Sequence, residues 1–83
     1  MKYTVTWIKL AESQLARIWT RATDRQAVAD ASDRIERELA SDAHRKGVPL
    51  GAFRTFTDDP LAVLFYVDPS DCMVRVVQVR QTN

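Results

Sequence analysis

The sequence has few of the residues that build metal centres, disulfides and membrane spans. It contains one cysteine, one histidine, two glycines and three prolines among 83 residues. A single cysteine excludes a disulfide within these residues, and one cysteine with one histidine makes a zinc site improbable. No apolar run reaches the roughly 18 residues that a membrane-spanning helix needs, so we expect no membrane partner. The sequence therefore predicts a domain with no metal and no other cofactor.

The chain also lacks an excess of charge of one sign. Twelve lysines and arginines balance eleven acids, which gives a formal net charge of +1. Nucleic-acid-binding domains usually carry a marked basic excess. Any anion site on this chain must therefore be local and depend on a few cations.

The length and the N-terminus indicate a single domain, residues 1–83, in the cytoplasm. A chain of this size builds one hydrophobic core. Residues Met1–Trp7 alternate between apolar and polar side chains, whereas the core of a signal peptide is a continuous apolar run.

Hydrophobic periodicity predicts a strand followed by two helices. The stretch Tyr3–Trp7 alternates large apolar residues with threonine, as a half-buried strand does. Apolar residues then recur every three or four positions over 11–22, which is typical of an amphipathic helix. Asp24 is a good N-cap for a second helix that runs to about Ala43. Because so few residues join the helices, we expect them to form an antiparallel hairpin.

The second half of the chain reads as a loop and three strands. We expect a loop over Ser41–Gly51, then strands over Phe53–Thr57, Leu61–Val67 and Cys72–Val79. The predicted class is therefore α+β in the order β-α-α-β-β-β, with an N-terminal strand, a two-helix antiparallel hairpin and three antiparallel strands. The helices pack on one face of the sheet, and the first strand joins beside a later one.

Two further patterns concern the surface. Asp30 with Arg34, and Asp33 with Arg37, are acid-before-base pairs at the spacing that forms ion pairs along an exposed helix face. Leu61–Val67 is apolar on both of its faces. A sheet that is covered on one side only would leave part of that apolar surface open, and such a patch usually indicates a partner.

Motifs at both ends of the chain resemble one known family. Residues Tyr3–Trp7 followed by Ala11–Trp19 are similar to a first strand and an "A-E-x-x-L-x-x-I-W" helix. Residues Pro60–Asp68 and Val74–Val79 are similar to a "Y-R-V-x-Y-x-V-D … V-x-V-L-x-V" closing hairpin. This set resembles the RelE/ParE superfamily of bacterial toxins from type II toxin–antitoxin modules, and in particular the short plasmid stabilisation toxins. The resemblance covers nearly the whole chain.

The resemblance implies a toxin that a partner antitoxin neutralises. RelE-like members cleave messenger RNA in the ribosome, which would make this chain an endoribonuclease with ribosome and mRNA as partners. ParE-like members inhibit DNA gyrase without chemistry on RNA. A third alternative is a toxin that has lost catalysis and only binds its antitoxin.

The resemblance also suggests site residues. RelE-like toxins use lysines and arginines on the sheet, and Arg54 stands where the family often has a basic residue. Ala62 stands where the family has an arginine, and Arg80 is the cation of the C-terminal tail. Arg54 and Arg80 are thus the catalytic candidates, which would stabilise charge on a phosphate in the transition state. The sequence stops at Asn83, where RNA-cleaving relatives place a histidine or tyrosine, and this favours the non-enzymatic alternatives.

A third arginine extends this hypothesis. Arg75 lies in the middle of an apolar strand, so it either faces the open side of the sheet or pairs with an acid such as Asp68. We predict that Arg54, Arg75 and Arg80 form a shallow cationic groove that binds an anion. The alternative is that they are ordinary solvated or structural arginines.

The loop after the second helix holds the densest group of cations. Arg45 and Lys46 are candidate anion-binding residues, and His44 is the only imidazole. The histidine could act as a general base. A cation at this position also favours the helix dipole, which is a structural role. Tyr66 is another possible proton donor, although its place in a strand favours packing.

Overall fold

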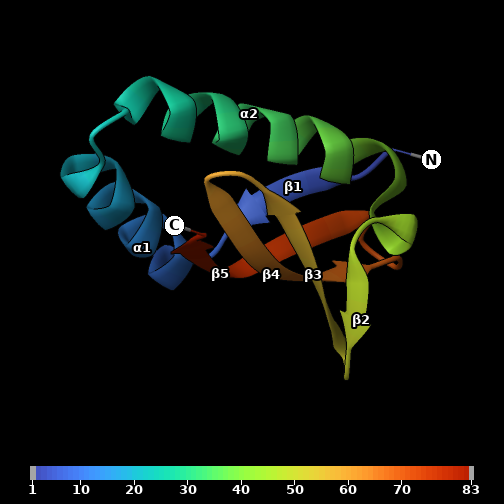
Figure 1. Ribbon diagram of the computed structural model, residues 1–83. Helices are drawn as coiled ribbons and strands as arrows, with labels where there is room; N and C mark the ends of the chain where they lie inside the picture. The colour runs from blue at the N-terminus through green and yellow to red at the C-terminus, as the bar shows by residue number, and fades with distance from the viewer. Residues whose placement is uncertain (1, 83) are drawn as a thin grey trace.

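A computed structural model describes residues 2–82 as a five-stranded sheet with two helices on one face (Figure 1). The strand order is β1-β5-β4-β3-β2. The elements are β1 (Thr4–Trp7), α1 (Lys9–Arg21), α2 (Arg25–Asp42), the short 3₁₀ helix η1 (Ala43–Arg45), β2 (Val48–Leu50), β3 (Phe53–Asp58), β4 (Leu61–Asp68) and β5 (Met73–Gln81). The predicted α+β class is confirmed. No helix among these residues has the length and apolar character needed to cross a bilayer.

The first strand closes the sheet by pairing with the last. β1 runs parallel to the first half of β5, with Thr4 opposite Met73 and Trp7 opposite Val76. The second half of β5 has α1 beside it instead of a strand. There, the Gln14 side chain accepts a hydrogen bond from the Val79 N–H at 2.9 Å. The two helices carry the chain from β1 to β2 at the opposite edge of the sheet, and β5 comes beside β1 after the turns that join β2 to β5.

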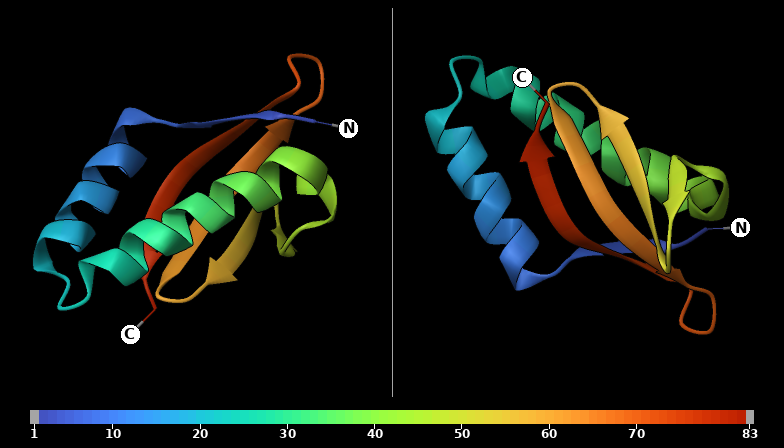
Figure 2. Two further views of the ribbon diagram at one scale, coloured as in Figure 1. Left: turned by 90° about the horizontal axis from the view of Figure 1, so that it is seen from above. Right: turned by 60° about the horizontal axis from the view of Figure 1, so that its bottom comes forward.

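α1 has no side-chain cap, and Ala11 is its one fully buried residue. α2 begins and packs as its sequence indicates. The Asp24 carboxylate accepts a hydrogen bond from the Ala27 N–H at 3.0 Å, so the predicted N-cap is confirmed. A cap of this kind stabilises a helix by about 1 kcal/mol. From this connection the helices diverge in a V (Figure 2). α2 buries its apolar stripe against the sheet, and this interface forms the core. Its fully buried larger side chains are Val28, Ile35, Leu39, Leu61, Val63, Phe65, Val74 and Val76.

The prediction that residues 41–51 form only a loop is wrong, because Val48–Leu50 pairs with β3 as strand β2. Gly47, with φ +70°, turns the chain into this strand. Gly51 has φ +61° and begins the two-residue turn into β3. Pro49 lacks an N–H, but a strand at the edge of a sheet tolerates that loss.

The predicted ion pairs along α2 are also wrong. The Arg34 guanidinium reaches Asp58 at the end of β3 rather than Asp30, with Nη2 2.9 Å from Oδ1 and Nε 3.0 Å from Oδ2. The hydrogen bond to Asp58 raises the pKa of Arg34. Among residues 2–82, no ion pair joins Asp33 to Arg37. A forked contact with one carboxylate offers two charge-assisted hydrogen bonds, which is why Arg34 bridges helix and sheet.

Candidate functional site

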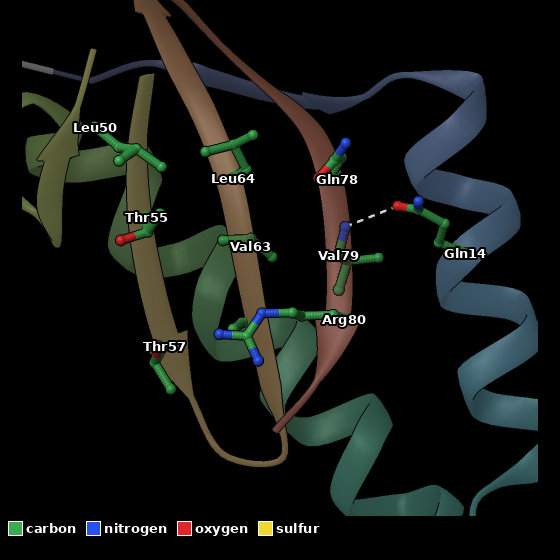
Figure 3. A pocket seen from close by; sticks show the side chains of 10 residues that line it. Gln14, Leu50, Thr55, Thr57, Val63, Leu64, Gln78, Val79 and Arg80 are labelled. Carbon is green, nitrogen blue, oxygen red and sulfur yellow. Dashed lines mark hydrogen bonds between the residues drawn. The ribbon is translucent and has the colours of Figure 1, made fainter. Parts of the chain in front are cut away.

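The sheet face opposite the helices forms a shallow groove. Its volume is about 400 Å³, and it crosses β3, β4 and β5 (Figure 3). The residues that line it are Gln14, Leu50, Thr55, Thr57, Ala62, Val63, Leu64, Gln78, Val79 and Arg80. Since the helices cover the other face, this is the surface of the sheet that a ligand or partner can reach.

Strand register arranges the groove in two rows. Leu64 lies between Thr55 and Gln78, and Ala62 lies between Thr57 and Arg80. Because side chains alternate along a strand, both rows point to the open face. The rows place hydroxyl and amide groups at the sides and aliphatic side chains in the middle. The groove can therefore donate and accept hydrogen bonds around an apolar floor.

Arg80 supplies the positive charge of the groove. Its guanidinium extends across β4 toward Thr57 (Figure 3). Ala62, directly opposite Arg80 on β4, is only 6% exposed although it is on the open face. Within residues 2–82, no ion pair or hydrogen bond engages the Arg80 guanidinium. An exposed guanidinium without an acid partner is suited to bind an anion such as phosphate.

Arg75 lies on the same face at a distance from Arg80. It is opposite Tyr66, whereas Arg80 is opposite Ala62. Four residues along β4 correspond to about 13 Å. Both alternatives predicted for Arg75 are realised together, because it faces the open side and also approaches an acid. That acid is Asp71, at 3.8 Å, and not Asp68.

The structure does not bring Arg54 into this groove, so the prediction of one groove with three arginines is wrong. Arg54 is opposite Phe65, a buried core residue, which places its side chain on the helix-covered face. Its Nε donates to the Lys46 carbonyl at 2.8 Å, and Nη2 donates to the Gly47 carbonyl at 3.4 Å. Arg54 thus holds the turn between η1 and β2.

The cations of the expected loop also lie outside the groove. His44 and Arg45 are in η1, and Lys46 caps it. Lys46 Nζ is 2.9 Å from Glu38 Oε2, and His44 Nε2 is 3.7 Å from Asp42 Oδ1. The open face therefore carries Arg75 and Arg80 from the predicted set.

The polar side chains of the groove were not predicted, whereas Tyr66 packs as its place in a strand indicated. Tyr66 is half-buried on the open face, edge-on to Phe53 with ring centroids 6.0 Å apart. Thr55, Thr57 and Gln78 were not singled out, although alternating polar residues in β3 and β5 were a signal for a solvated face. Among residues 2–82, no group of three or more histidine, cysteine or acidic side chains is placed to hold a metal ion.

Comparisons with known proteins identify the fold. No protein-family model matches the chain, and no curated protein matches it in sequence. Among solved structures, the chain superimposes with a TM-score of 0.83 on a chain of the toxin–antitoxin complex RelBE2 from Mycobacterium tuberculosis. The match covers 100% of this chain and 95% of that one, at 17% identity.

Two other complexes give the same result. A chain of the chromosomal ParDE system from P. aeruginosa matches with a TM-score of 0.70 and 15% identity, over 99% of this chain and 98% of that one. A chain of the archaeal RelE–RelB complex from Pyrococcus horikoshii OT3 matches with a TM-score of 0.55 and 15% identity, over 100% and 98%. The protein therefore has the RelE/ParE fold that its motifs predicted.

Proposed function

We propose that this chain is the toxin of a type II toxin–antitoxin module of the plasmid stabilisation type, neutralised by a partner antitoxin. The observation that carries the proposal is the full-length likeness to chains from three toxin–antitoxin complexes. The open groove and the exposed apolar side chains of Trp19, Val48 and Leu50 offer surface for a partner. Such a toxin would act in the cytoplasm.

Induction of the chain in a bacterial host tests this proposal. We expect growth arrest when the chain is expressed alone, because no antitoxin is present to neutralise it. Co-expression with the adjacent reading frame is expected to restore growth. Normal growth in both cases, with the folded chain present in the cells, would contradict a toxin role.

For the target, we propose messenger RNA during translation, bound on the open sheet face. Arg80 supports this choice, since it extends over a groove lined by hydroxyl and amide groups. The motif resemblance expects an arginine where Ala62 stands, and Arg80 is the cross-strand partner of that residue. Its guanidinium would bind the scissile phosphate and stabilise the charge that develops there. Arg75 would bind a phosphate further along the same RNA strand, whereas Arg54 would support the fold.

Replacing Arg80 with alanine tests the role of the groove. We expect messenger RNA cleavage, measured by primer extension after induction, to fall about a hundredfold because one charge-stabilising group is lost. Arg37→Ala removes an exposed arginine from the outer side of α2 and serves as the control. Equal cleavage by the Arg80→Ala and Arg37→Ala proteins would contradict the proposed site.

One observation favours inhibition of DNA gyrase, or antitoxin binding alone, as the second candidate. The residues that line the groove include no histidine, lysine or carboxylate that could take a proton from a ribose hydroxyl. A toxin that only binds its target needs no such group. Plasmid supercoiling after induction separates the candidates, since a gyrase inhibitor changes the topoisomer distribution and leaves messenger RNA intact.

A further inference from the structure

One end of the open sheet face is built from apolar and aromatic side chains. Leu50 pairs with Phe53 across β2 and β3, and Tyr66 pairs with Arg75 across β4 and β5. The rings of Phe53 and Tyr66 join the two pairs, since their centroids are 6.0 Å apart. A row of four side chains therefore crosses four strands, in the order Leu50, Phe53, Tyr66 and Arg75. We call the first three of them the aromatic ledge.

The aromatic ledge is open to solvent and continuous with the groove. Leu50 is 59% exposed and Phe53 is 37% exposed. The hairpin of β2 and β3 projects from the body of the protein, and the helices lie on the other face of the sheet (Figure 1). Leu50 also lines the groove over which Arg80 extends (Figure 3). A ligand in the groove can therefore cover the ledge and remove apolar surface from water.

The geometry of the two rings suits a flat ligand. The planes of Phe53 and Tyr66 meet at 73°. In such an edge-on contact, the ring that offers its edge keeps both of its faces clear of the other ring. Nucleobases of single-stranded RNA stack on the faces of aromatic side chains. The ledge therefore has the size and shape to hold one nucleobase.

Arg75 places a positive charge at the end of the same row. Its nearest acid, Asp71, is 3.8 Å away and mostly exposed. An ion pair this long on the surface contributes little stability, so an anion can replace Asp71 at small cost. A guanidinium binds phosphate oxygens well. The row thus offers a stacking surface and a cation side by side, and these bind the two ends of a nucleotide.

The next row toward Arg80 adds groups that can bond to the edge of a base. Thr55 and Gln78 flank Leu64 in this row. Gln78 is exposed, and its side-chain amide can both donate and accept hydrogen bonds. An apolar side chain of a protein partner would need neither this amide nor Arg75. The combination therefore favours a nucleotide over a protein segment as the occupant.

We propose that the aromatic ledge binds one nucleobase of the messenger RNA strand whose scissile phosphate lies at Arg80. Arg75 binds a phosphate of the stacked nucleotide, and the ledge positions the strand for cleavage. Arg75 and Arg80 are roughly 13 Å apart along the sheet, so the stacked nucleotide is a neighbour of the cut. The inference rests on the proposed function, because it takes messenger RNA on the open face as the ligand.

Fluorescence of 2-aminopurine tests the stacking, because this base analogue is quenched when it stacks on an aromatic ring. The probe is a short single-stranded oligonucleotide with 2-aminopurine at one position, and a series moves that position along the strand. Its 2′-O-methyl groups prevent cleavage by attack of the 2′-oxygen. We expect the full chain to quench one position of the series most strongly.

Substitutions of Phe53 show whether its ring causes the quenching. Phe53→Leu keeps an apolar side chain without a ring and is expected to weaken binding about tenfold and to abolish the quenching. Phe53→Tyr restores a ring and is expected to restore the signal. Leu10→Ala, which truncates an exposed apolar residue of α1 outside the groove, is the control. If Phe53→Leu binds and quenches as Phe53→Tyr does, the inference is overturned and the messenger RNA target stands.

Cleavage in cells gives a second readout of the same site. Primer extension after induction is expected to show about tenfold less cleavage by Phe53→Leu and a changed base preference beside the cut, whereas Leu10→Ala keeps the wild-type pattern. An unchanged yield and pattern in Phe53→Leu overturns the inference, even where the free oligonucleotide binds too weakly to measure. If the wild-type chain neither binds the oligonucleotide nor cuts messenger RNA, the proposed target fails and the ledge with it. A dimer of the free chain that Phe53→Leu dissociates, measured by sedimentation, would assign the ledge to a second copy instead.

Discussion

Replacing Gly47 with alanine is expected to destabilise the protein by at least about 3 kcal/mol. A Cβ atom at this position would lie 1.8 Å from the carbonyl oxygen of Thr55. That oxygen belongs to the backbone of β3, so relief requires a shift of the β2–β3 pair and not a change of rotamer. The φ of +70° adds the strain of a left-handed conformation. The same shift would disturb the Lys46 and Gly47 carbonyls that Arg54 binds.

Gly51 offers a matched control for this prediction. It also has a positive φ, of +61°, but a Cβ atom there would meet nothing within 4 Å. Gly51→Ala should therefore cost only the conformational strain, about 1 kcal/mol. Urea denaturation of both variants measures the free energy of unfolding. If the two substitutions cost the same, steric overlap at Gly47 does not determine its effect.

The elements that bury their own apolar pattern could be predicted from the sequence. The helices have apolar residues every three or four positions, and Asp24 marks the start of α2, so their place was predictable. The closing hairpin of β4 and β5 was predictable from its two runs rich in β-branched and aromatic residues. β2 carries no such signal, because it has three residues with a proline in the middle. It is a strand only because β3 lies beside it, and tertiary pairing of this kind is not encoded locally.

The location of the arginines depends on a feature with no sequence signal. Arg75 and Arg80 are five residues apart, which would place them on opposite faces of a regular strand. The register shifts between Leu64 and Phe65, where β5 has one extra residue, Val77. This β-bulge brings both arginines to the open face. The pairing of β3 with β4 has no such shift. Arg54 is opposite Phe65, so its side chain points to the covered face. The spacing of the three arginines in the sequence therefore does not show which of them share a face of the sheet.

The two faces of the sheet have different roles, and this difference predicts which substitutions unfold the protein. The covered face holds the apolar contacts between sheet and α2. The open face holds Arg80, the polar rows and the half-buried pair of Phe53 and Tyr66. Substitutions on the open face should therefore change binding more than stability, whereas those on the covered face should change stability first.

Replacing Phe65 with alanine is expected to cost about 3–5 kcal/mol, the largest loss from any single truncation in the core. Phe65 is the largest of the fully buried side chains, with none of its surface exposed. The expected loss is a large part of the roughly 5–15 kcal/mol that stabilises a typical domain. We therefore expect the free variant to be partly unfolded at 37 °C.

The matched control is Phe53→Ala, which removes the same side chain from the open face. Phe53 is 37% exposed, so its loss should cost only about 1 kcal/mol. Urea denaturation followed by far-UV circular dichroism gives both values, and a Phe65→Ala cost as small as that of Phe53→Ala would contradict the assignment of the core. A partner that binds only the folded chain stabilises it by mass action. If the chain is the toxin that we propose, co-purified antitoxin is therefore expected to restore the fold of Phe65→Ala.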